Sequence, residues 1–265
     1  YVAEPLNFGL LPQWATPHDS LPVKKSSGTG ASYSKEVQAH QSKLFNCKKE
    51  TLAQTKTVWV QPRAHSRCVV PITGYFEWLT AKKGEKTPYY VHLEQLLLFL
   101  AGLYSHNRNY NDTSLVGDGT AYFSSFSIAT GPAEGSGSNN MTWLHSRKPI
   151  FLAPFSPEWE RWLDPQQDWD TSVLECLNCD TNPVYDELKW HVVHGSVGNP
   201  KNNSAEVIKE VKATQLFITL FFYPRKRPAE EEPNKQAKKD DIKTENTVKK
   251  MDRVTEIKRE QASVE

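Results

Sequence analysis

The chain has 265 residues, of which 24% are charged, and its 32 Lys and Arg nearly balance its 31 Asp and Glu, for a formal net charge of +1. This balance excludes the strongly basic proteins whose charge alone indicates a nucleic-acid partner. Four cysteines in a chain of this length exclude a small disulfide-held scaffold. The longest apolar runs, 96–103 and 216–223, are too short to span a bilayer, so we expect no membrane partner.

Short apolar runs rich in β-branched and aromatic residues recur along the chain and predict strands. In chain order these runs are 68–71, 75–78, 89–93, 97–104, 122–129, 150–153 and 190–193. Helical patterns are fewer. Residues 34–45 are weakly helical, and 157–163 (PEWERWL) is amphipathic with a proline suited to the first turn. The polar segments between these runs, such as 18–33 and 197–203, are rich in turn residues.

Strands therefore outnumber helices, and we expect the α+β class: a mostly antiparallel β core with peripheral helices and a disordered C-terminal tail. The predicted domain is 1–213 and the predicted tail is 214–265. From Pro224 on, 22 of 42 residues are charged and none is aromatic, so this segment cannot bury enough apolar surface to fold alone. Because Tyr1 is not Met and the first residues already resemble the interior of a domain, we expect a domain that lacks its start.

One carboxylate, Glu77, lies between Phe76 and Trp78 in the predicted strand 75–78. A carboxyl group surrounded by aromatic surface is poorly solvated, which raises its pKa and allows it to move protons near neutral pH. Strand alternation also allows the opposite arrangement, in which Glu77 faces solvent while its neighbours pack. The local pattern leaves both interpretations open.

A compact polar cluster at 46–51 (NCKKET), followed by Lys56, combines an amide with several ammonium groups. It is either the solvated start of a helix or a patch that contacts phosphate groups. The CxxC pair Cys176 and Cys179 lacks a second cysteine pair of matching spacing, so we expect no metal site, and nothing in the sequence calls for a cofactor.

Residues 215–222 (QLFITLFF) resemble the box by which proteins bind the PCNA sliding clamp. The positions that carry this resemblance, and that we expect to contact the clamp, are Gln215, Ile218, Phe221 and Phe222. The same run is also compatible with a last strand of the domain. The basic residues 225–227, with further lysines about ten residues on, resemble a bipartite nuclear-import signal, so we expect a nuclear protein.

Several segments, taken in order, resemble motifs of the SRAP (SOS response-associated peptidase) family, whose eukaryotic members are the abasic site processing proteins. These segments are FGLLPQW (8–14), NCKKET (46–51), RCVVPITGYFEW (67–78), PYYVH (88–92), AGLY (101–104), HSRKP (145–149) and VGNPKNN (197–203). The resemblance extends from the first residue to about residue 212. The combination of GYFEW with HSRKP is its most specific part.

The resemblance implies a protein that binds single-stranded DNA and captures abasic sites. In the family, removal of the initiator Met exposes an N-terminal Cys, whose amine and thiolate react with the ring-opened sugar to give a thiazolidine crosslink. The implied catalytic residues are Glu77 for proton transfer, His145 for opening of the deoxyribose, and Asn46 beside the crosslink. The implied DNA contacts are Trp14, Lys48, Lys56 and Arg147.

This sequence departs from the family pattern at its nucleophile. No Cys precedes Cys47, and Cys47 cannot act instead, because a thiazolidine needs a free α-amine and a thiol on one residue. Two functions stay open: an abasic-site sensor that crosslinks to DNA, and a degenerate single-stranded DNA-binding module that does not. A protease acting on other proteins is disfavoured, because no Ser/His/Asp arrangement is present. In each case we expect a monomer.

Overall fold

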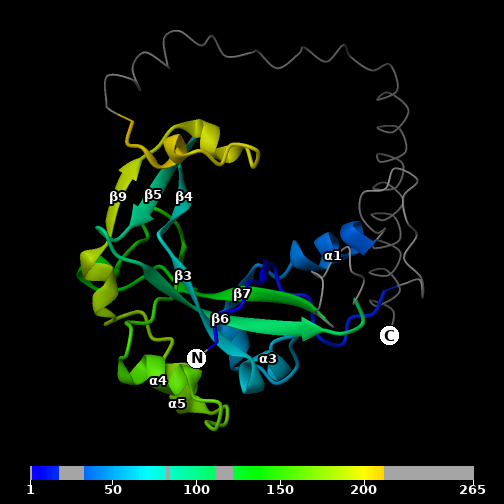
Figure 1. Cartoon of the computed structure of the whole chain (residues 1–265). Helices are drawn as coiled ribbons and strands as arrows, with labels where there is room; N and C mark the ends of the chain where they lie inside the picture. The colour runs from blue at the N-terminus through cyan, green and yellow to red at the C-terminus, as the bar shows by residue number, and fades with distance from the viewer. Residues whose placement is uncertain (1, 18–32, 82–83, 111–121, 212–265) are drawn as a thin grey trace, which may run out of the picture. The chain divides into compact units, whose positions relative to one another are not determined.

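The computed structural model describes residues 2–17, 33–81, 84–110 and 122–211 (Figure 1). All of them belong to the first of the two units into which the chain divides, Tyr1–Val211. The predicted tail 214–265 lies outside the described residues, and with it lie the basic cluster and the predicted clamp-binding residues Gln215, Ile218, Phe221 and Phe222.

The elements alternate between strands and short helices. The strands are β1 (Asn7–Phe8), β2 (Asn46–Lys48), β3 (Arg67–Ile72), β4 (Gly74–Thr80), β5 (Lys86–His92), β6 (Leu98–Asn107), β7 (Phe123–Pro132), β8 (Arg147–Pro149) and β9 (Lys189–Val192). The α-helices are α1 (Tyr33–Gln41), α2 (Lys49–Leu52), α3 (Val60–His65), α4 (Pro157–Leu163) and α5 (Thr171–Glu175). Single 3₁₀ turns are η1 (Gly137–Asn139), η2 (Pro183–Glu187), η3 (Gly195–Gly198) and η4 (Ala205–Ile208).

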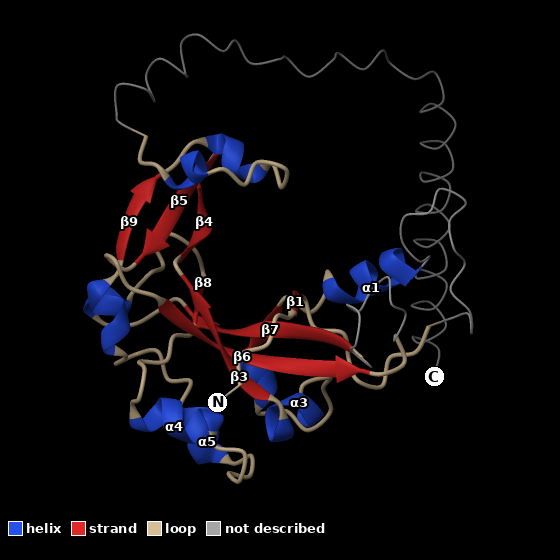
Figure 2. Cartoon of the chain, viewed as in Figure 1, coloured by secondary structure: helices blue, strands red, loops and turns tan. Residues whose placement is uncertain are grey.

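A six-stranded sheet, with the neighbour order β1-β7-β6-β3, forms the centre of the fold (Figure 2). Its two longest strands, β6 and β7, are antiparallel. Ile128 of β7 pairs with Gly102 of β6 and also with Asn46 of β2, so β2 lies along the opposite edge of β7 from β6. β1 pairs with β7 on that same edge, and β8 pairs with the C-terminal end of β7 on the other. Four other strands therefore meet at β7.

A separate three-stranded antiparallel sheet contains β4, β5 and β9. Only Thr73 separates β3 from β4, so one extended stretch of chain passes directly from the large sheet to the small one. The turn of the β4–β5 hairpin includes Gly84 at a φ of +77°, a conformation that glycine adopts without strain. Hydrophobic residues of both sheets, among them Leu100 of β6 and Val91 of β5, belong to one buried cluster.

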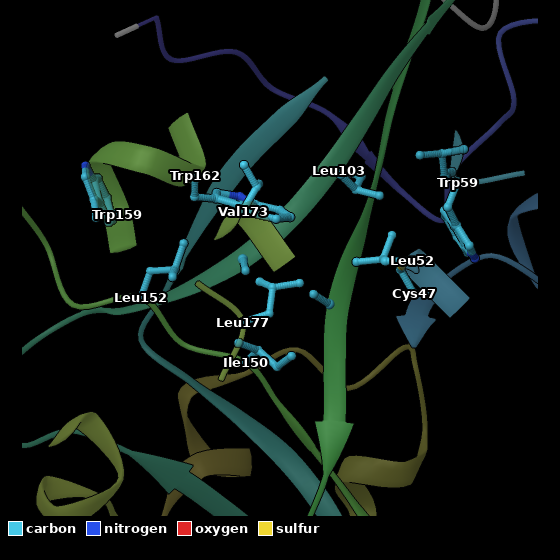
Figure 3. Close-up of a cluster of buried hydrophobic side chains, with 13 residues drawn as sticks. Cys47, Leu52, Trp59, Leu103, Ile150, Leu152, Trp159, Trp162, Val173 and Leu177 are labelled. Atoms are coloured by element: carbon cyan, nitrogen blue, oxygen red, sulfur yellow. The ribbon is translucent and has the colours of Figure 1, made fainter. Parts of the chain in front are cut away.

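A larger buried cluster joins the six-stranded sheet to α4 and α5, and it also includes Leu52 of α2 and Trp59 at the start of α3 (Figure 3). The Ser156 hydroxyl caps α4 by accepting a hydrogen bond from the N–H of Trp159 at 3.1 Å, and Pro157 follows in the first turn. This start fixes the helix so that Trp159 and Trp162 face the sheet. The indole N–H of Trp162 donates to the carbonyl oxygen of Cys68 in β3 at 2.9 Å, which joins α4 to the sheet.

The α+β class with mostly antiparallel strands is confirmed. Six of the seven predicted strands overlap β3, β4, β5, β6, β7 and β9, and the predicted helix 157–163 is α4. The strand predicted at 150–153 is reduced to an isolated antiparallel bridge between Phe151 and Leu100 of β6, and the ladder strand is β8 immediately before it. Ile150 N–H donates to Ala129 O of β7 while Leu152 N–H donates to Phe99 O of β6, so this apolar run crosses between two strands.

Candidate functional site

The C-terminal end of β7 gathers residues that are distant in the sequence. Thr130 pairs on one side with Lys48 of β2 and on the other with Pro149 of β8. Side chains alternate along β2, so Asn46 and Lys48 are exposed while Cys47 between them is buried. The structure therefore brings Asn46 and Lys48 of the NCKKET motif to the same end of β7 as the HSRKP motif, which contains β8.

Arg147 at the start of β8 is held in place by three groups of contacts. Its Nη1 and Nη2 donate to Oε1 and Oε2 of Glu50, each at 3.0 Å, in the bidentate geometry that favours Arg over Lys. Nη2 also donates to the Thr130 carbonyl oxygen at 2.6 Å, and Nε donates to the Thr130 hydroxyl at 3.3 Å. The hydrogen bonds from Arg147 hold the pKa of Glu50 below its usual value of 4.5.

Neither Glu50 nor Thr130 was singled out from the sequence. Glu50 lies inside the NCKKET motif, but its partner lies 97 residues further along the chain. The carboxylate within an otherwise cationic motif was the available signal, because an acidic residue among lysines is a natural ion-pair partner for an arginine elsewhere.

His145 is exposed and is oriented by the backbone of Arg147. Its Nδ1 lies 3.1 Å from both the N–H and the carbonyl oxygen of Arg147. When the N–H of Arg147 donates to Nδ1, the neutral ring carries its proton on Nε2, where it is available for donation. The backbone of Arg147 therefore positions this imidazole.

Glu77 lies half-buried on the face of β4 that also carries Tyr75 and Leu79. Its Oε1 accepts a hydrogen bond from the N–H of Trp78 at 3.0 Å. The Tyr75 hydroxyl lies 4.0 Å from the sulfur of Met141, and Tyr75 and Leu79 share a buried cluster with Met141 and Leu144. The face of β4 that bears Glu77 therefore packs against the chain segment that leads into His145.

Trp14 is placed at the other end of the large sheet. It is 69% exposed on a turn whose carbonyl oxygens at Pro12 and Ala15 accept hydrogen bonds from the Asn107 amide at 2.6 and 2.9 Å. Asn107 pairs with Phe123 at the start of β7. Thr130 is seven residues further along β7, roughly 24 Å at the usual rise of a strand, so this turn does not lie with the Arg147 cluster.

The remaining candidate groups divide by exposure. Lys56 is exposed between α2 and α3. Cys47 is buried, and its burial raises the pKa of its thiol far above the usual range, while burial raises the pKa of Cys68 to about 12. Among the residues that the structure describes, no group of three or more His, Cys, Asp or Glu is arranged to hold a metal ion. In the same ranges, no helix has the length and apolar character that crossing a membrane requires.

The motifs that meet at this site also appear together in a known family. The family model described as "SOS response associated peptidase (SRAP)" matches residues 1–200. The chain belongs to the SRAP family. Among solved structures, a protein from Bacteroides thetaiotaomicron has a TM-score of 0.55 at 21% identity, and the match covers 78% of this chain and 76% of that protein, which shows a similarity of fold alone.

Curated SRAP relatives cover different shares of the chain. Abasic site processing protein YMR114C of Saccharomyces cerevisiae is 33% identical over 171 residues, 63% of this chain, and the match spans only 41% of the yeast protein. Abasic site processing protein YoqW of Bacillus subtilis is 27% identical over 208 residues, 77% of this chain and 75% of its own length. Abasic site processing protein HMCES of Xenopus tropicalis is 25% identical and covers 91% of this chain and 67% of its own.

Proposed function

We propose that this chain processes abasic sites in DNA and that it binds them in single-stranded DNA. One observation carries the proposal: β2, β8 and the segment before β8 bring Asn46, Lys48, His145 and Arg147 to one end of β7, with the Glu77 face of β4 packed against the same segment. Family membership and the names of the SRAP relatives support the choice of an abasic site as the target.

The cationic side chains bind the phosphates of the strand in this proposal. Lys48 and Lys56 are exposed, and as lysines they attract phosphate without the bidentate fork of a guanidinium. Arg147 is already oriented by Glu50 and Thr130, which fixes its guanidinium at the edge of the site. Trp14, at the other end of β7, stacks on a base of the same strand further from the lesion.

His145 and Glu77 move protons during opening of the abasic sugar. The closed deoxyribose is a hemiacetal, and it opens when its C1′ hydroxyl loses a proton while its ring oxygen gains one, which leaves an aldehyde. His145 and Glu77 supply the acid and the base for these two transfers, and the Asn46 amide hydrogen-bonds to the sugar. General acid–base catalysis of this kind contributes about 10²- to 10⁴-fold.

A specific observation favours a second candidate, in which the 265 residues bind DNA without forming a crosslink. A thiazolidine requires an amine and a thiol on one residue, and the Cys47 thiol is buried with its pKa raised by burial. A buried thiol is neither exposed to the sugar nor ionised. The crosslink and the removal of an initiator Met therefore depend on a residue that these 265 positions do not include.

The finer predictions from the sequence belong to the same proposal. The SRAP domain is 1–213 and acts as a monomer, and the segment 214–265 directs the protein to the nucleus and docks it on the sliding clamp. The clamp contacts are Gln215, Ile218, Phe221 and Phe222. Calorimetry tests this docking. If the segment binds the clamp, the parent chain binds it and the double variant Phe221→Ala with Phe222→Ala does not. If the segment is instead a strand of the domain, neither protein binds the clamp.

Free L-cysteine provides a direct test, because it supplies the amine and the thiol together. We expect the chain to bind single-stranded DNA with an abasic site more tightly than intact DNA, and to accelerate thiazolidine formation between L-cysteine and that site at least about tenfold. Glu77→Gln and His145→Ala are expected to lose the acceleration but to keep the binding. Mass spectrometry of the DNA measures the reaction and fluorescence anisotropy measures the binding.

The possible outcomes separate the two candidates. Preferential binding without acceleration would leave the DNA-binding module as the function of these residues. Equal acceleration by the parent, Glu77→Gln and His145→Ala would show that the assigned proton-transfer roles are wrong. Equal affinity for intact and abasic strands would overturn the proposed target.

A further inference from the structure

We propose that Tyr89, Trp143 and Trp190 form a stacking platform that receives a nucleobase next to the abasic sugar, an inference that rests on the proposed function. No family motif described above includes Trp143 or Trp190. The platform deepens the proposed function by assigning the site a recognition element for the nucleotide that flanks the lesion.

The three aromatic rings are contiguous. The Tyr89 ring meets that of Trp143 edge-on, with centroids 5.4 Å apart and planes at 80°, and the Trp143 ring lies 5.3 Å from that of Trp190. Trp143 is 38% exposed and Trp190 is 48% exposed. These are large fractions for indoles already packed against one another, so the pair leaves apolar ring surface accessible to a ligand.

Strand register places the platform on the side of the small sheet that faces the site. Tyr89 pairs with Glu77, and Trp190 pairs with Val91, which in turn pairs with Tyr75. Directly paired residues lie on the same face of a sheet, and so do residues two apart on one strand. Tyr89, Trp190 and Glu77 therefore share one face.

The turn that carries Trp143 is fixed before any ligand arrives. Met141 and Leu144 are buried in the cluster shared by the two sheets. Trp143, which lies between them, and His145, which follows Leu144, are exposed. The N–H groups of Leu144 and His145 both donate to the Met141 carbonyl oxygen, and the N–H of Met141 donates to Ala133 O at 2.9 Å. Two residues of chain span at most about 7 Å, so Trp143 is within reach of a nucleotide that adjoins a sugar held at His145.

The charge at the same end of β7 favours a nucleic acid as the occupant. Lys48 is exposed on β2, which pairs with β7 at Thr130, and Arg147 of β8 is ion-paired with Glu50. A site that offers both cationic groups and exposed aromatic rings can hold a single strand, since the charges attract the backbone and the rings stack on the bases. An abasic site has lost its own base, so stacking must use a neighbouring one.

The test measures whether a neighbouring base and the two indoles depend on each other. Single strands of about 15 nucleotides carry a central tetrahydrofuran, which mimics the abasic sugar and cannot react, between two adenines. In the comparison strands, the 5′ or the 3′ adenine is replaced by a second tetrahydrofuran. For the full chain we expect one of these replacements to weaken binding by about tenfold, within the range for loss of one base–aromatic stack. Fluorescence anisotropy gives the affinities.

The double variant Trp143→Ala with Trp190→Ala is expected to bind the parent strand about tenfold more weakly and to be insensitive to the replaced adenine. The double variant with Phe at both positions should recover most of the affinity and the sensitivity. Phe155→Ala is the matched control, because Phe155 is 79% exposed but lies just before α4. It should behave as the parent.

The proposal is overturned if the Ala double variant keeps the full dependence on the flanking adenine, or if it weakens binding to every strand equally. Absence of binding by the parent chain would overturn both the platform and the proposed function. The parent chain could also be sensitive to the flanking base and yet bind a central nucleotide as tightly as a central tetrahydrofuran. That result would retain the platform and overturn the proposed target. The failures of the two proposals are therefore distinguishable.

Discussion

The two ends of β7 carry different chemistry on one rigid strand. At its C-terminal end, β2 and β8 surround Thr130 with exposed or half-buried charged groups, among them Lys48 and Arg147. At its N-terminal end, a buried amide, Asn107, holds an apolar turn from which Trp14 projects. The first end attracts and orients charge, whereas the second presents an aromatic surface. The contrast indicates that the proposed contacts to phosphate and to bases depend on different ends of β7, so a substitution at one end can remove one kind of contact and leave the other.

Replacing Asn107 by Ala should have the largest effect, on stability. Asn107 is fully buried, its amide donates to two carbonyl oxygens, and its Oδ1 accepts from the N–H groups of Asn109 and Tyr110 at 2.8 and 3.1 Å. Buried groups without partners cost about 1–3 kcal/mol each, so we expect the free energy of unfolding to fall by about 3 kcal/mol or more. Urea denaturation measures it.

Asn109→Ala is the matched control, because Asn109 is exposed and its amide reaches the same turn at Ala15. Its cost should stay below about 1 kcal/mol. Equal losses in the two variants would contradict the role given to the buried amide.

Trp14→Ala should weaken DNA binding about tenfold and leave the stability almost unchanged. The loss of one base–aromatic stack is worth about 1–3 kcal/mol, and a side chain that is 69% exposed contributes little to the core. Anisotropy with single-stranded DNA and urea denaturation measure the two quantities. Trp14→Phe should bind nearly as the parent. A large loss of stability with unchanged affinity would assign Trp14 to packing.

Arg147→Gln should weaken binding to single-stranded DNA by about fivefold and reduce its dependence on salt. One lost phosphate contact lowers the slope of log affinity against log salt concentration by about 0.7 for single strands. Arg147→Lys should keep the slope but lose part of the affinity, because it keeps the charge without the bidentate fork. A slope that is the same in all three proteins would mean that Arg147 does not touch a phosphate.

The smallest effect concerns the Glu50–Arg147 pair and is expressed through pH. The pKa of Glu50 is lowered in the folded chain, so its contribution to stability is complete above its usual pKa and is lost as the pH falls through the lowered value. The pair is partly exposed, so this contribution is at most about 0.5 kcal/mol. The stability difference between the parent and Glu50→Gln at pH 7 should therefore shrink as the pH falls below 4.5 and vanish once the pH lies below the lowered pKa of Glu50. A difference that grows with acidity would contradict the assignment.

Much of the fold could be predicted because apolar runs in the sequence indicate strands. The run 68–71 overlaps β3 and the run 97–104 overlaps β6. β8 could not, because its sequence is Arg-Lys-Pro and its strand character comes only from pairing with β7. A buried lysine is also contrary to expectation. Lys148 is 1% exposed, and its ammonium lies 4.4 Å from the centre of the Tyr185 ring and donates to backbone carbonyls that no local pattern identifies.

The candidate site, like the fold, could be predicted only in part. Its motif residues were visible in the sequence, whereas their partners were not, because those contacts join distant parts of the chain. The Glu50–Arg147 pair joins residues 97 positions apart, and the contact of Trp143 with Trp190 depends on the register of β9. The orientation of Glu77 was also open until packing of Tyr75 and Leu79 fixed the face of β4.

The short strands β1 and β2 have a consequence for the newborn protein. Both cover the same edge of β7, yet Asn7 and its partner Ser124 are 117 positions apart. At translation rates of about 5–20 residues per second, β1 emerges roughly 6–23 seconds, and β2 roughly 4–16 seconds, before the strand that completes their hydrogen bonds. During that interval they carry unpaired backbone groups on the ribosome, so factors that shield nascent chains should affect the yield of this protein more than its final stability.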